Sequence, residues 1–291
     1  MPTFINTKGM NRIEWRKIRK NYLGASEIAA AVGLNPYRSQ LDLWRDKTGD
    51  PTFSEFKGNT YTKWGNRLES AIAWGFAKDF KLKIKQDHKL RIHDNKILSC
   101  SLDRLVLDGR KKGILEIKNM GDKAFSKLVM DISDVSMMYY SQIQQQFSVS
   151  ELTWGYFIIL VGGNTLVVRK VKPDKKFIKL QDELGMMFWN EHILTKKEPE
   201  YNLIYQNKYK ALKIMCRESE DWKKFRFTPD LAEDEEKDPL KIFIRKIESS
   251  KNKTELNKLI ETQDSVIVKM NRDNKSLITT IVKLKLIQLR R

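Results

Sequence analysis

Residues 97–118 read Ile-Leu-Ser-Cys-Ser-Leu-Asp-Arg-Leu-Val-Leu-Asp-Gly-Arg-Lys-Lys-Gly-Ile-Leu-Glu-Ile-Lys, and their pattern decides the fold of this chain. Short apolar runs on both sides of a basic turn predict two paired strands. Side chains alternate between the faces of a strand, so Glu116 and Lys118 share one face while Ile117 points into the core. We therefore expect Asp103 and Glu116 to lie near each other on these strands.

The order of two acids and a lysine is typical of a hydrolytic metal site. The carboxylates of Asp103 and Glu116 can bind an ion of the magnesium class, which prefers oxygen ligands, keeps several waters and coordinates phosphate oxygens. Lys118, one step along the same face, can orient or deprotonate the attacking water and offset negative charge. A lone Glu-x-Lys sequence is more often a solvated pair on an exposed strand, so the interpretation depends on the neighbouring segments.

The segments on both sides of this strand pair predict helices. Upstream, a helix begins near residue 64 and carries Glu69 in its early part. Its apolar positions are Leu68, Ile72, Trp74, Phe76 and Phe80. Downstream, residues 139–147 predict another helix, on which Gln142 shares a face with Gln145 or Gln146.

The chain then predicts a second strand pair. Residues 153–161 form an apolar, buried-looking strand, residues 162–164 supply a glycine-rich turn, and residues 165–171 return. A helix over residues 177–189 is expected to pack over this second pair. Helix, strand pair, helix and strand pair together predict an α/β fold with a restriction-endonuclease-like core, in which helices flank a mixed central sheet.

These segments resemble the YqaJ-like viral recombinases, the family of lambda-type exonucleases within the PD-(D/E)xK nuclease superfamily. The resemblance covers roughly residues 10–202 and rests on several motifs in the same order. They are Trp15-Arg-Lys-Ile-Arg19, Leu23-Gly-Ala-Ser-Glu27, Asn35-Pro-Tyr-Arg-Ser39, Leu43-Trp-Arg-Asp-Lys-Thr-Gly49, Trp64-Gly-Asn-Arg-Leu-Glu69, Ser101-Leu-Asp103, Leu115-Glu-Ile-Lys118 and Tyr140-Ser-Gln142. The resemblance implies a magnesium-dependent 5′-to-3′ exonuclease that acts on linear duplex DNA and leaves single-stranded 3′ tails for recombination.

The resemblance also implies a role for each matching residue. The catalytic residues would be Glu69, Asp103, Glu116, Lys118 and Gln142. Magnesium, which manganese can replace, would bind to Asp103, Glu116, the carbonyl of Ile117 and Glu69. The 5′-phosphate of the DNA would bind to Arg19, Ser26, Ser101 and Lys123.

Two positions depart from the family pattern. Leu102 replaces the usual proline, which changes the stiffness of the backbone more than its chemistry. Ala124 stands where a second arginine would contact the terminal phosphate, and Lys123 is beside it. A lysine supplies charge but not a bidentate fork, so the phosphate pocket is less completely matched than the metal site.

The composition agrees with a nucleic-acid substrate. The chain has 55 Lys and Arg against 37 Asp and Glu, a net charge of +18, which attracts a polyanion. An AT-rich genome also raises the lysine content of its proteins, so individual lysines that contact DNA cannot be named from charge alone.

Cysteine use and hydropathy predict a soluble cytoplasmic protein, of phage or prophage type by the resemblance. Cys100 and Cys216 are the only cysteines and lack metal-binding spacing, which argues against a disulfide scaffold and an iron-sulfur cluster. No stretch approaches the roughly 18 apolar residues of a membrane helix, and the N-terminus lacks a secretory apolar run.

We expect a nuclease domain over residues 1–204 and a mainly helical extension over residues 205–291. Within the extension, residues 240–247 and 256–260 predict helices, whereas residues 276–291 fit either a helix or a strand. The extension could serve for oligomerisation, for docking a partner, or as a small subdomain that covers the core. The resemblance implies a ring-shaped homo-trimer around DNA and a single-strand annealing protein as partner.

Two other functions are compatible with the same sequence. A metal-dependent DNA endonuclease would use the same core, because a fold does not determine its substrate. A non-catalytic DNA-binding recombination accessory protein could retain the fold without the reaction. The presence of all five matching catalytic residues argues against the second alternative.

Overall fold

The computed structural model describes residues 2–51, 53, 58–129, 135–199, 209–214 and 252–262, with five single positions between residues 219 and 285. The chain divides into two compact units, Met1–Arg226 and Phe227–Arg291. In the second unit, helix α11 (Lys253–Thr262) confirms the helix predicted at residues 256–260. The predictions for residues 276–291, and most of those for residues 205–252, fall outside the described residues. The mainly helical extension therefore stays a prediction.

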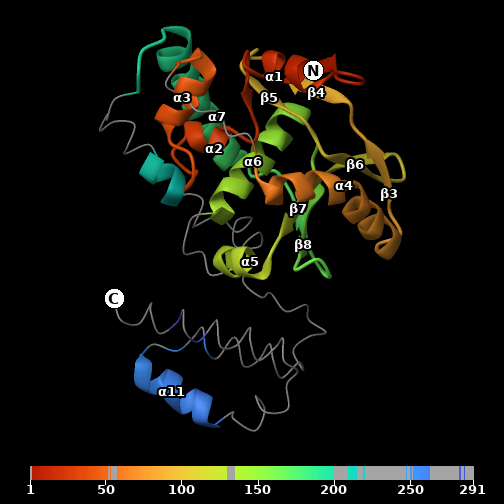
Figure 1. Ribbon diagram of the computed structural model, residues 1–291, viewed down its shortest axis with the longest axis vertical. Helices are drawn as coiled ribbons and strands as arrows, with labels where there is room; N and C mark the ends of the chain where they lie inside the picture. Colours follow the sequence, from red (N-terminus) through yellow and green to blue (C-terminus); the bar gives the residue numbers. More distant parts are fainter. Residues whose placement is uncertain are drawn as a thin grey trace. The chain divides into compact units, whose positions relative to one another are not determined.

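The first unit contains two β-sheets (Figure 1). A four-stranded sheet has the order β1 (Thr3–Asn6), β4 (Lys89–Ile92), β5 (Leu98–Cys100) and β2 (Leu23–Gly24). A five-stranded sheet has the order β3 (Lys83–Gln86), β6 (Arg104–Asp108), β7 (Lys111–Met120), β8 (Gly155–Val161) and β9 (Thr165–Val171). Strands β7 and β8 are parallel and the other neighbours in this sheet are antiparallel, so the predicted mixed sheet is confirmed.

Both predicted strand pairs form hairpins in the five-stranded sheet. The β6–β7 hairpin closes at the pair Asp108 and Lys111, so its turn is shorter than the basic segment suggested. Asp103 lies one residue before β6 and not within a strand, whereas Glu116 lies inside β7. The β8–β9 hairpin turns at Gly162 and Gly163, whose φ angles of 60° and 83° lie in the left-handed region that glycine adopts most easily.

Helices cover both faces of the five-stranded sheet. Helix α4 (Thr60–Asp79) begins at Asn59, whose side chain caps the helix, and packs one apolar face on the sheet. The core between them consists of Ile72, Ala73 and Phe76 from α4 and Val106, Leu115, Ile117 and Ile158 from the strands. Helix α6 (Val135–Ser150) lies on the opposite face, where the rings of Tyr139 and Phe157 are 5.6 Å apart.

Not all the apolar positions predicted for α4 face the core. Ile72 and Phe76 are buried, but Trp74 and Phe80 are 64% and 46% exposed. At about 100° per residue, Trp74 is rotated by roughly 200° from Ile72, which places it on the outer face of the helix. The sequence pattern identified the helix correctly and overstated the width of its buried face.

Helix α7 (Lys175–Phe188) continues as a π-helix over Trp189–Leu194. It packs mainly on α6, on α2 (Ile28–Ala31) and on β5, so the expectation that it covers the second strand pair is wrong. Gly185 allows α7 to approach α2 closely, since an added Cβ at this position would lie 2.5 Å from Cδ1 of Ile28. Further described helices of this unit are α1 (Arg12–Arg19), α3 (Gln40–Thr48) and α5 (Asp122–Val129), and residues 209–214 are also helical. No helix in the described part of the chain is long and apolar enough to cross a membrane.

Candidate active site

Strand β7 directs the charged side chains of Glu116 and Lys118 toward helix α6. Leu115 and Ile117 pack toward α4, so the alternation along the strand turns Glu116 and Lys118 to the opposite face. There the ammonium of Lys118 donates a hydrogen bond to Oε1 of Glu116 and lies 5.4 Å from the centre of the Tyr139 ring. The acid and the lysine therefore share one face beneath α6.

Helix α6 fixes the carboxylate of Glu116, which is only 1% exposed. Nε2 of Gln142 donates to Oε1 at 2.6 Å, and Nε2 of Gln146 donates to Oε2 at 2.6 Å. Of the two glutamines that sequence spacing allowed as neighbours of Gln142, Gln146 is the one beside the acid. Gln145 instead donates to the carbonyls of Leu23 and Ser99 at 2.8 and 2.9 Å and joins α6 to the four-stranded sheet.

Asp103 reaches the same place from the start of β6. Its Oδ2 accepts a hydrogen bond from the main-chain N–H of Ile117 at 2.9 Å, which ties the acid to the strand that carries Glu116. Burial, and then the charge of Glu116, raise the pKa of Asp103 to about 8, although Lys118 and the Ile117 N–H act in the opposite direction. The partly buried Asp103 and the buried Glu116 thus lie close enough to repel each other.

Lys118 carries a positive charge at this site. Burial alone would lower its pKa, but the carboxyl groups of Glu116 and Asp103 together outweigh burial and raise the pKa above the usual value for lysine. An ammonium in this position can donate a hydrogen bond to a water molecule or to a phosphate oxygen. It suits orientation and charge neutralisation better than removal of a proton.

The donor set of this site fits a magnesium ion. Asp103 and Glu116 offer oxygen atoms, and a cation beside them would offset the repulsion that raises the pKa of Asp103. Within the described residues, no group of three or more His, Cys, Asp or Glu side chains could hold a metal ion by itself. Magnesium tolerates such a site, since it is commonly held by one or two carboxylates together with water and substrate phosphate.

Glu69 is held by a residue that the sequence patterns did not single out. Nη1 of Arg104 donates to Oε1 of Glu69 at 2.6 Å, and Nη2 donates to Oγ of Ser70 at 2.8 Å. Arg104 pairs with Leu115 across the hairpin, which places it on the α4 face of the sheet. Glu69 still contributes to the raised pKa of Asp103, so its charge acts on the site from that side. The signal available in the sequence was the position of Arg104, immediately after Asp103.

We expect the Arg104–Glu69 pair to couple α4 to the hairpin energetically. Arg104 is 8% exposed, and the side chain of Glu69 is 32% exposed. In a double-mutant cycle with Arg104→Met and Glu69→Gln, the coupling energy should be about 1–2 kcal/mol, between that of a surface pair and that of a buried pair. Urea unfolding of the four proteins measures it. A coupling energy near zero would show that the pair does not hold Glu69 in place.

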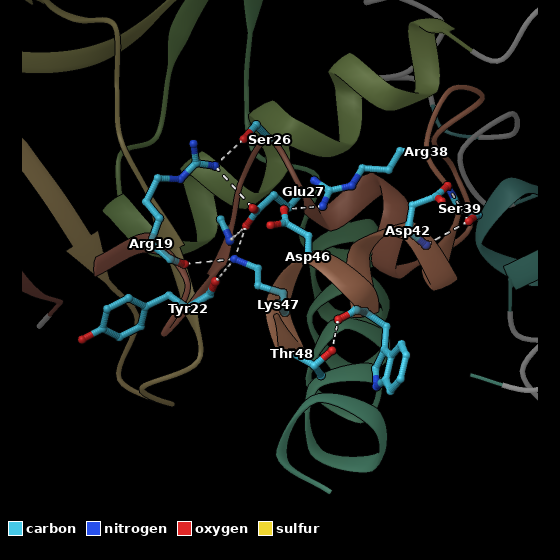
Figure 2. A network of polar contacts seen from close by, with 12 residues as sticks. Arg19, Tyr22, Ser26, Glu27, Arg38, Ser39, Asp42, Asp46, Lys47 and Thr48 are labelled. Atoms are coloured by element: carbon cyan, nitrogen blue, oxygen red, sulfur yellow. Dashed lines mark hydrogen bonds and ion pairs between the residues drawn. The ribbon is translucent and has the colours of Figure 1, made fainter. Parts of the chain in front are cut away.

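A second polar cluster lies around the end of α1 (Figure 2). Nη2 of Arg19 donates to Oγ of Ser26 at 2.8 Å and lies 3.7 Å from Oε1 of Glu27. The ammonium of Lys47, on α3, lies 2.8 Å from Oε2 of Glu27 and also donates to the carbonyls of Arg19 and Tyr22 at 2.9 and 2.6 Å. The pairing of Arg19 with Ser26 is therefore part of a wider network.

In this cluster two cations share one carboxylate. Burial would raise the pKa of Glu27, but Lys47 and then Arg19 outweigh it and lower the pKa. Burial lowers the pKa of Lys47, and the attraction of Glu27 offsets this only in part because the like charge of Arg19 is nearby. The formal charges of Arg19, Lys47 and Glu27 sum to one positive charge, and the side chain of Arg19 is 32% exposed. Arg19 can therefore accept a further anionic partner.

Sheet pairing brings Ser101 toward the same region. Strands β2 and β5 are parallel, and Gly24 of β2 lies opposite Ser99 of β5. Ser26 and Ser101 each come two residues after this pair, so both lie beyond the same end of the two strands. Oγ of Ser101 is buried and has no hydrogen-bond partner among the residues that the structure describes, as expected for an atom that contacts a ligand. Lys123 is exposed in the first turn of α5, and no contact within the described residues joins it to Arg19, Ser26 or Ser101.

The mixed sheet has helices on both faces, and an acidic pair is formed by Asp103, just before β6, and Glu116, within β7. Together these features define a restriction-endonuclease-like α/β fold. Residues 14–153 match the model of the YqaJ-like viral recombinase domain, so this part of the chain is similar to that family, and the resemblance inferred from its motifs is confirmed.

One protein sequence and two solved structures are also similar to this chain. The chain is 27% identical over 193 residues to the uncharacterized protein YqaJ of Bacillus subtilis (strain 168), covering 65% of this chain and 59% of that protein. It therefore spans less than two thirds of that relative's length. The alkaline exonuclease LHK-Exo of Laribacter hongkongensis superposes with a TM-score of 0.50 at 15% identity, covering 70% of this chain and 98% of that one. A phage-related exonuclease of Haemophilus somnus 129PT gives 0.47 at 11% identity, over 63% of this chain and 100% of that one. The similarity to the Laribacter protein shows the fold alone.

Proposed function

We propose that this protein is a magnesium-dependent deoxyribonuclease that digests linear duplex DNA from its 5′ ends. The observation that carries the proposal is the cluster of Asp103, Glu116, Lys118 and Gln142 between β7 and α6. A partly buried and a buried carboxyl group, a lysine and an amide meet there, and these groups are suited to hydrolysis of a phosphodiester. The net charge of +18 favours a polyanionic substrate.

Each residue of the cluster has its own proposed role in hydrolysis. Asp103, Glu116 and the carbonyl of Ile117 would hold magnesium, which when bound makes a water molecule a better nucleophile and neutralises charge on the phosphate. Gln142 fixes the orientation of the Glu116 carboxylate. Lys118 donates to the attacking water or to the phosphate and offsets the charge that develops in the transition state. Glu69 adds negative charge from the α4 side as a ligand or through a water molecule.

The proposed preference for a 5′ end depends on the second cluster. Arg19 and Ser26 are already hydrogen-bonded, and Ser101 supplies a buried hydroxyl two residues before Asp103. A terminal phosphate bound there would lie next to the acidic pair, so hydrolysis would begin at that end. Continued removal of nucleotides would leave a single-stranded 3′ tail suited to recombination. A homo-trimer, an annealing partner and a contribution of Lys123 remain predictions of the family resemblance.

We expect linear duplexes with a 5′-phosphate to be digested about 10- to 100-fold faster at limiting concentration than duplexes with a 5′-hydroxyl. Hydrogen bonds to a charged group contribute about 1.5–3 kcal/mol, and 1.4 kcal/mol corresponds to a factor of ten. Arg19→Gln should remove most of this difference. Lys17→Gln replaces an exposed lysine on the same helix and should leave the rate difference between the two duplexes unchanged.

The measurement is release of acid-soluble nucleotides from the two duplexes by the three proteins. Equal rates on both duplexes with the wild-type protein would contradict the phosphate pocket and leave the hydrolytic site unaffected. Cutting of a closed circular duplex would indicate an endonuclease instead. Duplex binding without any magnesium-dependent hydrolysis would indicate a non-catalytic DNA-binding protein.

A further inference from the structure

Two tryptophans on the outer face of α4 are exposed to solvent although the helix is otherwise well packed. Trp64 is 49% exposed and Trp74 is 64% exposed. Arg67 and Lys78 are exposed on the same helix. These four side chains are called the tryptophan stripe below.

Helical geometry places the four side chains in one row. At about 100° per residue they fall within an arc of roughly 80°, whose centre is turned by roughly 140° from the direction of Ile72 and Phe76, with Trp64 at the edge nearest to Ile72. Trp64 and Trp74 are separated by ten residues, or about 15 Å along the helix axis. The row therefore faces away from the core of the five-stranded sheet, and packing on that sheet does not account for its aromatic character.

Each ring of the stripe has its own cation. The guanidinium carbon of Arg67 lies 5.2 Å from the centre of the Trp64 ring, and Nζ of Lys78 lies 5.0 Å from the centre of the Trp74 ring. Cations at this distance are attracted to the electron-rich face of an indole. An exposed aromatic ring next to a positive charge is the combination that binds single-stranded nucleic acid, because bases stack on the ring while phosphates approach the cation.

The surroundings of the stripe favour a polyanion over a neutral or cationic partner. Residues 58–86 contain six basic and two acidic side chains. One of the two acids, Glu69, is already paired with Arg104 on the inner side of the helix. Two of the six basic residues, the exposed Lys83 and Lys85, lie on strand β3, which follows α4.

We propose that the tryptophan stripe is a binding site for single-stranded DNA. Single-stranded DNA is favoured over duplex because the bases of a duplex are already stacked on one another and offer no free face to an indole. A spacing of about 15 Å corresponds to between four and five stacked bases at 3.4 Å each. Glu69 lies on the inner side of α4, so the stripe is about one helix diameter, 10 Å, from the acid. The identification of the bound strand as the tail left by digestion rests on the proposed exonuclease function, whereas the binding itself does not.

Binding of a fluorescent oligothymidylate to the full-length protein, measured by anisotropy in EDTA, tests the stripe without hydrolysis. The double variant Trp64→Ala/Trp74→Ala should bind at least about tenfold more weakly, because each stacked base contributes a factor of roughly five or more. Trp64→Phe/Trp74→Phe retains flat rings and should recover most of the affinity. Phe4→Ala removes another exposed ring, 55% exposed with Nζ of Lys89 at 3.8 Å, and should bind like the wild type.

The two cations of the stripe give a second measurement. The logarithm of the association constant should fall less steeply with the logarithm of salt concentration in Arg67→Gln/Lys78→Gln, by about 1.4 for the loss of two phosphate contacts. An unchanged slope would contradict a role of these cations in binding the strand.

The outcomes separate this proposal from the proposed function. If the wild type digests linear duplex DNA and the alanine double variant binds oligothymidylate normally, the stripe proposal is wrong and the exonuclease stands. If binding depends on the two tryptophans but no hydrolysis occurs, the stripe stands and the exonuclease fails. If the double variant changes the oligomeric state in sedimentation without changing oligothymidylate binding, the stripe is a protein interface and the proposal is overturned.

Discussion

Glu116→Gln is expected to lower magnesium-dependent hydrolysis of linear duplex DNA by about 10³-fold or more, while duplex binding in EDTA changes by no more than a few-fold. A metal ligand supports several kcal/mol of charge stabilisation in the transition state, and each 1.36 kcal/mol is a factor of ten in rate. The affinity for DNA comes mainly from basic side chains, which this substitution leaves in place. Asp103→Asn should behave in the same way. Release of acid-soluble nucleotides and anisotropy of labelled duplex give the two quantities.

Asp108→Asn is the matched control for these variants. Asp108 is an exposed acid at the turn of the same β6–β7 hairpin, so its loss removes one negative charge without touching the cluster. The control should hydrolyse DNA at the wild-type rate. Wild-type turnover by Glu116→Gln in a folded protein would remove the acidic pair from the mechanism.

Glu27→Gln is expected to lower the free energy of unfolding of the first unit by about 3–5 kcal/mol. The side chain of Lys47 is 2% exposed, and the substitution leaves its charge buried without the carboxylate that lies 2.8 Å away. The double variant Glu27→Gln/Lys47→Met removes both charges and should regain much of the loss. Denaturant unfolding followed by tryptophan fluorescence measures all three proteins. A loss below about 1 kcal/mol in the single variant would show that the pair behaves like a surface salt bridge.

The contribution of Glu27 should depend on pH in a defined direction. Its pKa is lowered in the folded protein, so the stabilisation is fully present above the unfolded value of about 4.3 and is lost as the pH falls through the folded value. The difference in stability between the wild type and Glu27→Gln should therefore be constant from about pH 5.5 to pH 7 and shrink below about pH 4. A difference that grew on acidification would contradict the assigned charge state.

Local patterns in the sequence predicted four strands of the five-stranded sheet, β6 to β9, but not β3. Alternation placed Glu116 and Lys118 on one face, and the glycines at 162–163 marked the second hairpin, because both features depend only on neighbouring residues. Helical spacing alone does not determine whether Gln145 or Gln146 lies beside Gln142 and contacts Glu116. That choice depends on how α6 is rotated against the sheet, which tertiary packing decides.

Features that depend on distant contacts were not predictable in this way. In the four-stranded sheet, the two-residue strand β2 pairs with β5. A strand of this length is too short to be predicted from a local sequence pattern. Arg104 was passed over because a buried arginine at a strand start resembles any other basic residue until its partner, Glu69, is known. Trp74 belongs to the apolar pattern that predicts α4, but its rotation around the helix axis leaves it exposed.

A time course on linear duplex DNA, labelled at either the 5′ or the 3′ ends and incubated with magnesium, tests the proposed exonuclease most directly. The 5′ label should be released early as short products, while 3′-labelled strands stay full length, and EDTA should abolish the reaction. Absence of magnesium-dependent hydrolysis, early loss of the 3′ label, or internal fragments from the first time points would contradict a 5′-to-3′ exonuclease built on Asp103, Glu116 and Lys118.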